Sequence, residues 1–270
     1  MARRMTRLVT LTTDVGSAYA AQMKAVLYRR VPPGHVVDIA HDLPAQGIDE
    51  AAFLLRHIGA AFPSGSVHVA IVDPGVGGRR APLAVRCRDG SYLVGPDNGV
   101  LAPLADHLGV ASVVRILHDR VNPDGRASAT FEGRDLFAPA AARLATGATM
   151  RSLGPPSALT PHPLAEPRRD GAWVHGSVVH TDRFGNAVTN VPSEWFARSP
   201  DSLRVRFGGR RRVLPRRRIY AELALGELGV LGSSFGTLEV SAREASASEL
   251  LGLRVGARVS FARPAPPSRR

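Results

Sequence analysis

Apolar positions in the first half of the chain alternate between a strand-like and a helix-like spacing. Runs of β-branched and apolar residues predict strands, and the segments between them with a 3.6-residue period predict helices. The predicted strands are 7–13, 36–39, 67–72, 82–86, 91–94 and 112–117, and the predicted helices are 17–30, 47–61, 99–107 and 136–146. This alternation favours an α/β N-terminal domain with a mostly parallel central sheet, which we place at residues 1–153.

The second half of the chain has a different pattern. Residues 154–170 are rich in proline, which neither continues a helix nor fits a central strand, so we interpret them as a linker. Short apolar runs between glycine turns then predict a small all-β, barrel-like C-terminal domain over residues 171–263. We expect a disordered tail at 264–270. The predicted strands are 173–181, 187–191, 203–207, 211–214, 229–232, 237–241 and 257–262, with a short helix near 245–251.

Two carboxylates that follow buried strands are the first candidates for chemistry. Asp14 follows the first predicted strand and Asp73 follows the third. Ligands of such sheets bind beyond the carboxyl ends of the strands, where both residues are expected. Asp73 could accept hydrogen bonds from sugar hydroxyls or orient a water molecule, although Asp-Pro-Gly is also a common tight turn. The glycines that follow have neither Walker spacing nor a GxGxxG pattern, so a standard nucleotide loop is excluded.

Three further segments are ambiguous when each is taken alone. The segment 130–135 (TFEGRD) precedes a predicted helix, so it either caps that helix or offers Glu132 as a general base. The segment 182–186 (DRFGN) is either a hairpin turn or a site where Phe184 stacks on a heterocycle and Asn186 pairs with its edge. Residues 233–236 (SSFG) form a similar turn with a second aromatic residue.

Composition narrows the class of protein. The formal net charge is +12, and the positive charge is concentrated in Arg204–Arg218 and at the two ends of the chain. We interpret Arg204–Arg218 as a solvated hairpin rather than a nucleic-acid site, because aromatic residues for base stacking are scarce. The single cysteine, Cys87, permits neither an internal disulfide nor a thiolate metal site. With no signal peptide and no membrane-spanning apolar run, we expect a soluble cytoplasmic protein.

Taken together and in their order along the chain, seven motifs resemble those of one protein family over nearly the whole length. They are 12–16 (TTDVG), 41–51 (HDLPAQGIDEA), 72–77 (VDPGVG) with Arg80, 95–99 (GPDNG), 130–139 (TFEGRDLFAP), 182–190 (DRFGNAVTN) and 234–240 (SFGTLEV). The chain resembles the S-adenosylmethionine hydrolases that form adenosine, also called S-adenosylmethionine hydroxide adenosyltransferases. These enzymes are related to the fluorinase and the chlorinase.

The resemblance implies a homotrimer that uses no metal or redox cofactor. Each active site would lie between the N-terminal domain of one subunit and the C-terminal domain of the next. Asp14 and Asp73 would hold the ribose hydroxyls or the attacking water, Arg80 would help to position that water, and Gln46 would lie near the sulfonium. The methionine ammonium and carboxylate would contact Asp182 and Ser234, and adenine would contact Phe184, Asn186 and Phe235.

The sequence departs from the family pattern in two places. Glu132 stands where the hydrolases usually have histidine, and a carboxylate can also accept a proton. Two nearby carboxylates should raise the pKa of one of them, unless Arg80 or Arg134 lies between them. The loop after Asp14 is also shorter than usual and lacks an acidic residue, which allows a related adenosyl sulfur compound as substrate.

The sequence therefore predicts hydrolysis of S-adenosylmethionine to adenosine and methionine, with water attacking C5′ of the ribose. The halogenases tend to carry tyrosine in place of Asp73, and a carboxylate there disfavours a halide ion. The predicted catalytic residues are Asp73, Arg80 and Glu132. Two alternatives remain: a non-catalytic protein that binds S-adenosylmethionine or adenosine, and a nucleic-acid-associated protein that uses Arg204–Arg218.

Overall fold

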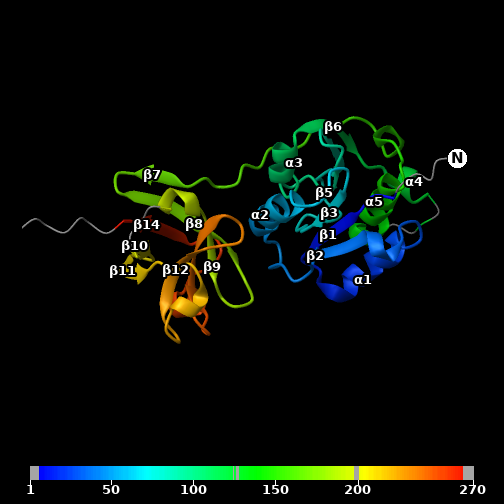
Figure 1. The fold of residues 1–270 in the computed structure, drawn as a ribbon. Helices are drawn as coiled ribbons and strands as arrows, with labels where there is room; N and C mark the ends of the chain where they lie inside the picture. Colours follow the sequence, from blue (N-terminus) through cyan, green and yellow to red (C-terminus); the bar gives the residue numbers. More distant parts are fainter. Residues whose placement is uncertain (1–5, 124, 126–127, 198–200, 264–270) are drawn as a thin grey trace, which may run out of the picture. The chain divides into compact units, whose positions relative to one another are not determined.

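The chain folds into two compact units, which a computed structural model describes over residues 6–123, 125, 128–197 and 201–263. One unit runs from Met1 to Leu164 and the other from Ala165 to Arg270 (Figure 1). The boundary between them falls inside the proline-rich segment. The predicted tail at 264–270 lies outside the described residues.

The N-terminal unit is built on a six-stranded sheet with the order β2-β1-β3-β5-β4-β6. The strands are β1 (Val9–Thr13), β2 (Val36–Ala40), β3 (Val67–Ile71), β4 (Pro82–Cys87), β5 (Tyr92–Pro96) and β6 (Val110–Arg115). The neighbours β2-β1, β1-β3 and β3-β5 pair in parallel, whereas β4 is antiparallel to both β5 and β6. The α/β prediction is confirmed, with an antiparallel edge added to the parallel centre.

Helices cover both faces of this sheet. On one face, α1 (Gly16–Leu27) and α5 (Ala138–Ala145) pack on Val9 and Leu11 of β1 in a large apolar core. On the other, α2 (Ile48–Gly59) packs with α3 (Ala102–Leu108) (Figure 1). Every residue of β1 and β3 is buried, as expected for strands covered on both faces.

The C-terminal unit is an eight-stranded antiparallel sheet with the order β11-β10-β14-β8-β9-β13-β12, and β7 pairs with β8. A bridge between Arg216 and Val230 brings the β11 end to β12, so the sheet is nearly closed, and the barrel-like prediction is confirmed. The strands are β7 (Arg168–Asp170), β8 (Trp173–Thr181), β9 (Ala187–Pro192), β10 (Ser202–Phe207), β11 (Arg210–Pro215), β12 (Leu228–Gly232), β13 (Thr237–Ala242) and β14 (Arg258–Ala262), with the short helix α6 (Ala247–Leu251).

The proline-rich segment is more ordered than a simple linker. The carbonyl of Pro155 accepts a hydrogen bond from the Arg115 amide at 3.0 Å, since proline lacks an N–H but keeps its acceptor. Thr160 donates through its amide and its hydroxyl to the Asp97 carboxylate, at 2.9 Å each. The segment ends in β7, a strand that the sequence pattern did not predict.

Two helices begin differently from their predictions. The helix expected from residue 136 is preceded by a π-helical turn, Gly133–Phe137, which continues directly into α5. The helix expected from residue 99 begins at Ala102, because Gly99 has a φ of 106° that a helix cannot contain. No helix in the described part of the chain is both long and apolar enough to cross a membrane.

A buried histidine gives the N-terminal unit a pH-dependent stability. His68 of β3 lies against the α2 face, with its Nδ1 2.9 Å from the Thr10 hydroxyl. Burial lowers its pKa from 6.5 to about 4, and the charge of Asp89 offsets only part of that effect. Between these values the unfolded chain binds a proton that the folded chain does not, so stability falls as the pH falls.

We predict that this proton destabilises the wild type by up to about 3 kcal/mol between pH 7 and pH 4. Urea unfolding of the wild type and of His68→Gln at both pH values measures the difference. The variant should be less stable at pH 7 and should lose less stability on acidification. Equal losses in the two proteins would contradict the assignment.

Candidate functional site

Polar residues gather beyond the carboxyl ends of the parallel strands. Asp14 follows β1 directly, Asp73 lies two residues after β3, and Asp97 follows β5. The side-chain amide of Asn98 donates to the carbonyl of Val72 at 2.8 Å, which ties the β5 end to the segment that carries Asp73. This is the edge where ligands of such sheets bind.

The central feature of this edge is one arginine shared by two carboxylates. Arg80 Nε donates to both oxygens of Asp73, at 3.1 and 3.0 Å. Its Nη2 is in hydrogen-bond contact with Asp73 Oδ2 and with Glu132 Oε2. The structure thus brings together the three predicted catalytic residues, although Glu132 lies 52 positions after Arg80 in the chain.

The loop that carries Asp73 and Arg80 is held in a tight conformation. The Val76 amide donates to the Asp73 carbonyl at 3.3 Å, and the Gly78 amide donates to the Gly75 carbonyl at 2.9 Å. Gly77 has a φ of 72°, and a Cβ atom at this position would lie 2.5 Å from the carbonyl oxygen of Ala129. Glycine is therefore required where this loop packs against the segment that leads to Glu132.

Glu132 is placed by the π-helical turn that follows it. Arg134 forms two hydrogen bonds with Asp135, at 2.7 and 2.8 Å, and Asp135 also accepts from the Ser128 amide at 2.9 Å. The Arg134 side chain is thus committed to Asp135, so Arg80 is the cation that lies between Asp73 and Glu132. Single turns of π-helix often occur at functional sites.

The cluster is only partly exposed. The side chains of Asp73, Arg80 and Glu132 are 5%, 10% and 23% exposed, and the Phe137 ring lies 5.7 Å from the Arg80 guanidinium carbon. Burial alone would lower the pKa of Arg80, but the hydrogen bonds to Asp73 and Glu132 raise it above its ordinary value. Arg80 is therefore a permanent cation that fixes the Asp73 carboxylate.

Asp14 and Gln46 form a second part of the site. Asp14 Oδ2 accepts from the Gln46 backbone amide at 3.0 Å, so the two predicted binding residues are in contact. Gln46 has a φ of 65°, a left-handed conformation that is uncommon for a residue other than glycine. Such strain is most frequent at functional positions. Tyr19, which was expected in a loop after Asp14, lies in α1 and packs edge-on against Phe131, with 5.2 Å between ring centroids.

A chain of polar contacts behind Asp14 was not predicted from the sequence. His41 Nδ1 lies 2.9 Å from the Thr13 hydroxyl, and His41 Nε2 lies 3.0 Å from Asp38, which also binds Lys24 at 2.8 Å. The carbonyl of His41 accepts from the Gly16 amide at 2.8 Å. His41 thus holds both sides of the loop that carries Asp14. The signal for it was its place at the start of the 41–51 motif, after a predicted strand.

In the C-terminal unit, Asp182 organises the turn between β8 and β9. Its Oδ1 accepts from the amides of Phe184 and Asn186, at 2.9 Å each, and its Oδ2 accepts from the Asn186 side chain at 2.8 Å. Phe184 is 73% exposed, whereas Asn186 is buried. The exposed ring of Phe184 is available for stacking, while the carboxylate of Asp182 already accepts three hydrogen bonds from its own turn.

The turn between β12 and β13 holds the other two predicted binding residues. Ser234 is exposed, and the Phe235 ring packs edge-on against His180, with 6.3 Å between ring centroids. Since His180 lies two residues before Asp182, this contact brings the Phe235 ring toward the 182–186 turn. Each unit thus groups its own predicted site residues. The described residues contain no group of three or more His, Cys, Asp and Glu side chains placed to hold a metal ion.

Comparison with known proteins gives relatives over nearly the whole length. Residues 9–154 match the model of the SAM hydroxide adenosyltransferase N-terminal domain, and residues 176–260 match that of the C-terminal domain. An (R)-S-adenosyl-L-methionine hydrolase from Thermus thermophilus is 40% identical, covering 93% of this chain and 97% of the relative. A protein of the same name from Salinispora tropica is 38% identical, covering 93% and 96%.

A solved structure agrees with these matches. The crystal structure of an uncharacterized conserved protein from Thermotoga maritima superposes with a TM-score of 0.88 at 31% identity, covering 95% of this chain and 100% of that one. The two domain matches, the identity to the hydrolases and this fold agree with one another. The chain therefore belongs to the SAM hydroxide adenosyltransferase family.

Proposed function

We propose that this protein hydrolyses (R)-S-adenosyl-L-methionine to adenosine and L-methionine. The names of the relatives that are 38–40% identical support this reaction. The observation that carries the proposal is the Asp73–Arg80–Glu132 cluster, in which one guanidinium holds two carboxylates at the ligand-binding edge of the sheet. The test is incubation of the purified protein with S-adenosylmethionine and chromatographic detection of adenosine and methionine.

The charge of the cluster suits this substrate. When both carboxylates are ionised, two negative charges and one guanidinium leave an excess of one negative charge. That excess attracts the sulfonium cation and repels a halide ion, since a half-buried anion beside an uncompensated negative charge is costly. The cluster therefore favours water over a halide as the attacking group.

The two carboxylates have different tasks in the mechanism that we propose. Both oxygens of Asp73 are bound by Arg80, which fixes the orientation of this nearly buried group toward a water molecule. Glu132 is more exposed, and its Oε1 has no hydrogen-bond partner among the described residues, so it can accept a proton. The water oxygen bonds to C5′ as the C5′–S bond breaks. Sulfur keeps the bonding electron pair in neutral methionine, and the surplus proton of the water passes to Glu132.

We further propose that the working enzyme is a homotrimer without a metal or redox cofactor, with each site shared by two subunits. The division of the binding residues supports this arrangement. Asp14 and Gln46 belong to the N-terminal unit, whereas Asp182, Phe184, Asn186, Ser234 and Phe235 belong to the C-terminal unit. In such a site the aromatic rings of the C-terminal unit hold adenine, and the N-terminal unit aligns water with the C5′–S bond.

Asp73→Asn should lower kcat by roughly 100-fold to 10,000-fold, because the amide cannot keep the charge and the double contact with Arg80. Affinity for S-adenosylmethionine should change much less. Single-turnover rates and calorimetric binding separate the two quantities. A variant with full turnover would exclude Asp73 from the reaction.

Two substitutions of Glu132 test the proton acceptor. Glu132→Gln keeps the size but cannot take a proton, so kcat should fall by roughly 100-fold. Glu132→His restores a base and should recover much of that loss, with a pH profile that acquires an inflection near 6.5. The pH dependence of kcat for the three proteins is the measurement. If the glutamine variant is as active as the wild type, another group accepts the proton.

Mixing two inactive variants tests the shared site. Asp73→Asn damages the N-terminal half, and the double variant F184A/F235A damages the adenine-binding half. If sites lie between subunits, coexpressed trimers should recover about one quarter of wild-type activity. In a random mixture, about one site in four combines an intact N-terminal half from one variant with an intact C-terminal half from the other. Mixtures that stay as inactive as the separate variants would place each site within one subunit.

A further inference from the structure

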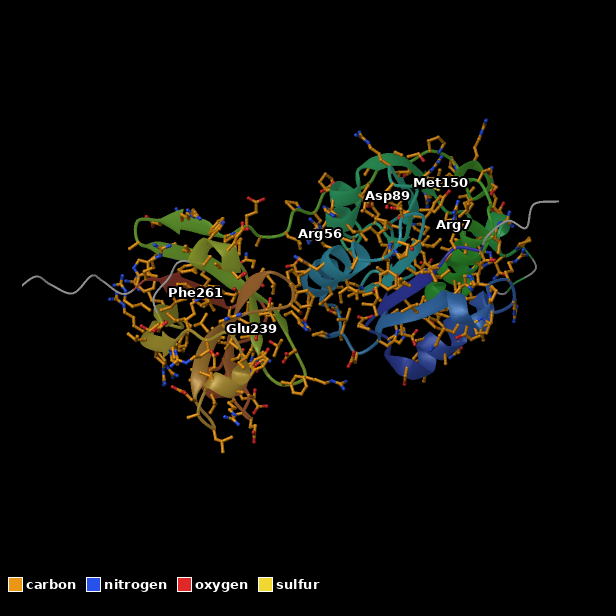
Figure 2. All side chains as sticks on the ribbon, viewed as in Figure 1. Arg7, Arg56, Asp89, Met150, Glu239 and Phe261 are labelled. Atoms are coloured by element: carbon orange, nitrogen blue, oxygen red, sulfur yellow. The ribbon has the colours of Figure 1, made fainter. Side chains whose placement is uncertain are left out.

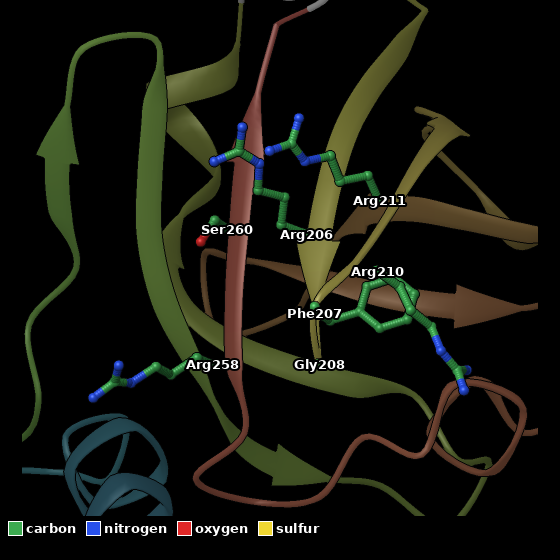
Figure 3. Close-up of a pocket in the computed structure, with 8 residues that line it drawn as sticks. Arg206, Phe207, Gly208, Arg210, Arg211, Arg258 and Ser260 are labelled. Atoms are coloured by element: carbon green, nitrogen blue, oxygen red, sulfur yellow. The ribbon is translucent and has the colours of Figure 1, made fainter.

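Several arginines lie on the C-terminal sheet, far in the sequence from the residues assigned to catalysis. A cavity of about 280 Å³ is lined by 206–211, Arg258 and Ser260. The guanidinium groups of Arg206 on β10 and Arg211 on β11 lie next to each other above it, beside Ser260 of β14 (Figure 3). The surrounding side chains of the unit appear as sticks in Figure 2.

These arginines lack acidic partners. In the described part of the chain, Arg206, Arg210, Arg211 and Arg258 form no ion pair with a carboxylate. Arg206 Nε is shielded from solvent and has no hydrogen-bond partner there. Burial, followed by the charges of Arg211 and Arg204, lowers the pKa of Arg206. Adjacent guanidinium groups that repel one another without a carboxylate between them are well suited to an anion.

The basic residues continue across the sheet in register. Arg211 pairs with Arg206, Arg206 with Ser260, Ser260 with His175, and His175 with Arg168. Their neighbours Val205, Val259 and Val174 are buried, so this row faces outward. Four gaps between strands give the row a length of about 19 Å. Asp170 is the acidic group near its β7 end, 3.8 Å from His175 and 3.9 Å from Arg168.

An aromatic residue lies in the next row. Trp173 on β8 has the guanidinium carbon of Arg206 3.6 Å from its ring centroid and that of Arg204 at 5.2 Å. Stacked guanidinium and indole planes of this kind offer flat surfaces to nucleobases. A row of about 19 Å is also too long for a single phosphate group.

We propose that this face of β11, β10, β14 and β8 binds single-stranded nucleic acid. The arginine row takes the phosphodiester backbone, and the Arg206–Trp173 stack takes bases. The site is independent of the proposed hydrolysis. The sequence favoured a solvated hairpin at Arg204–Arg218. The strand pairing changes this interpretation, because it aligns Trp173, Ser260 and Arg168 with the arginines of that hairpin.

Fluorescence anisotropy with a labelled oligothymidylate of about 12 nucleotides tests the proposal. Contact with about three phosphates predicts a slope near −2 for log K against log salt concentration. The double variant Arg206→Gln/Arg211→Gln should weaken binding about tenfold and reduce the magnitude of the slope by about 1.4, while hydrolysis stays unchanged. The matched control, Arg29→Gln/Arg30→Gln, removes two charges from the other unit and should bind like the wild type.

Two further measurements identify the ligand. In a Trp195→Phe background, Trp173 is the remaining tryptophan, and oligothymidylate should quench its fluorescence whereas inorganic polyphosphate should not. Equal loss of binding in the two double variants, or no change in Trp173 fluorescence, would overturn the proposal. Binding to phosphatidylserine vesicles with no binding to the oligonucleotide would also overturn it, in favour of a membrane surface.

Discussion

The sharing of Arg80 between Asp73 and Glu132 is the interaction on which the candidate site depends. Asp73 is nearly buried and Glu132 partly so, and their carboxylates would repel each other; the guanidinium between them offsets that repulsion while holding Asp73 by both oxygens. The sharing of Arg80 also depends on the conformation of the backbone. Because Gly77 has no side chain, the loop that carries Asp73 can pack against Ala129. In the π-helical turn after Glu132, Arg134 binds Asp135, so Arg80 is the cation that binds Asp73 and Glu132.

The two units supply different kinds of recognition. The N-terminal sheet places Asp14 and Asp73 beyond the carboxyl ends of its parallel strands, and we propose that they and Glu132 meet the cationic substrate. The C-terminal sheet presents an exposed ring, Phe184, on a turn that Asp182 holds rigid through three hydrogen bonds. In the function that we propose, binding of a flat heterocycle and alignment of water with a C–S bond are therefore separate tasks on separate elements.

Most of the fold and of the candidate site could be predicted from the sequence. The features that could not be predicted have physical causes. Asp73 and Arg80 lie seven residues apart in one loop, but only the order of the motifs indicated that Glu132 joins them. The antiparallel edge formed by β4 was missed, although Asp89-Gly90 between two strands is a hairpin signal. The contacts of His41 with Thr13 and Asp38, and the row from Arg211 to Arg168, depend on strand pairing, which periodicity alone does not give.

The most direct test of the central claim is a single turnover in water enriched in oxygen-18, with mass spectrometry of the products. If a solvent water held beside Asp73 attacks C5′, the 5′-hydroxyl of adenosine carries the label and methionine does not. Adenosine without the label would contradict the account, because its oxygen would then come from a carboxylate of the protein that attacked C5′ directly.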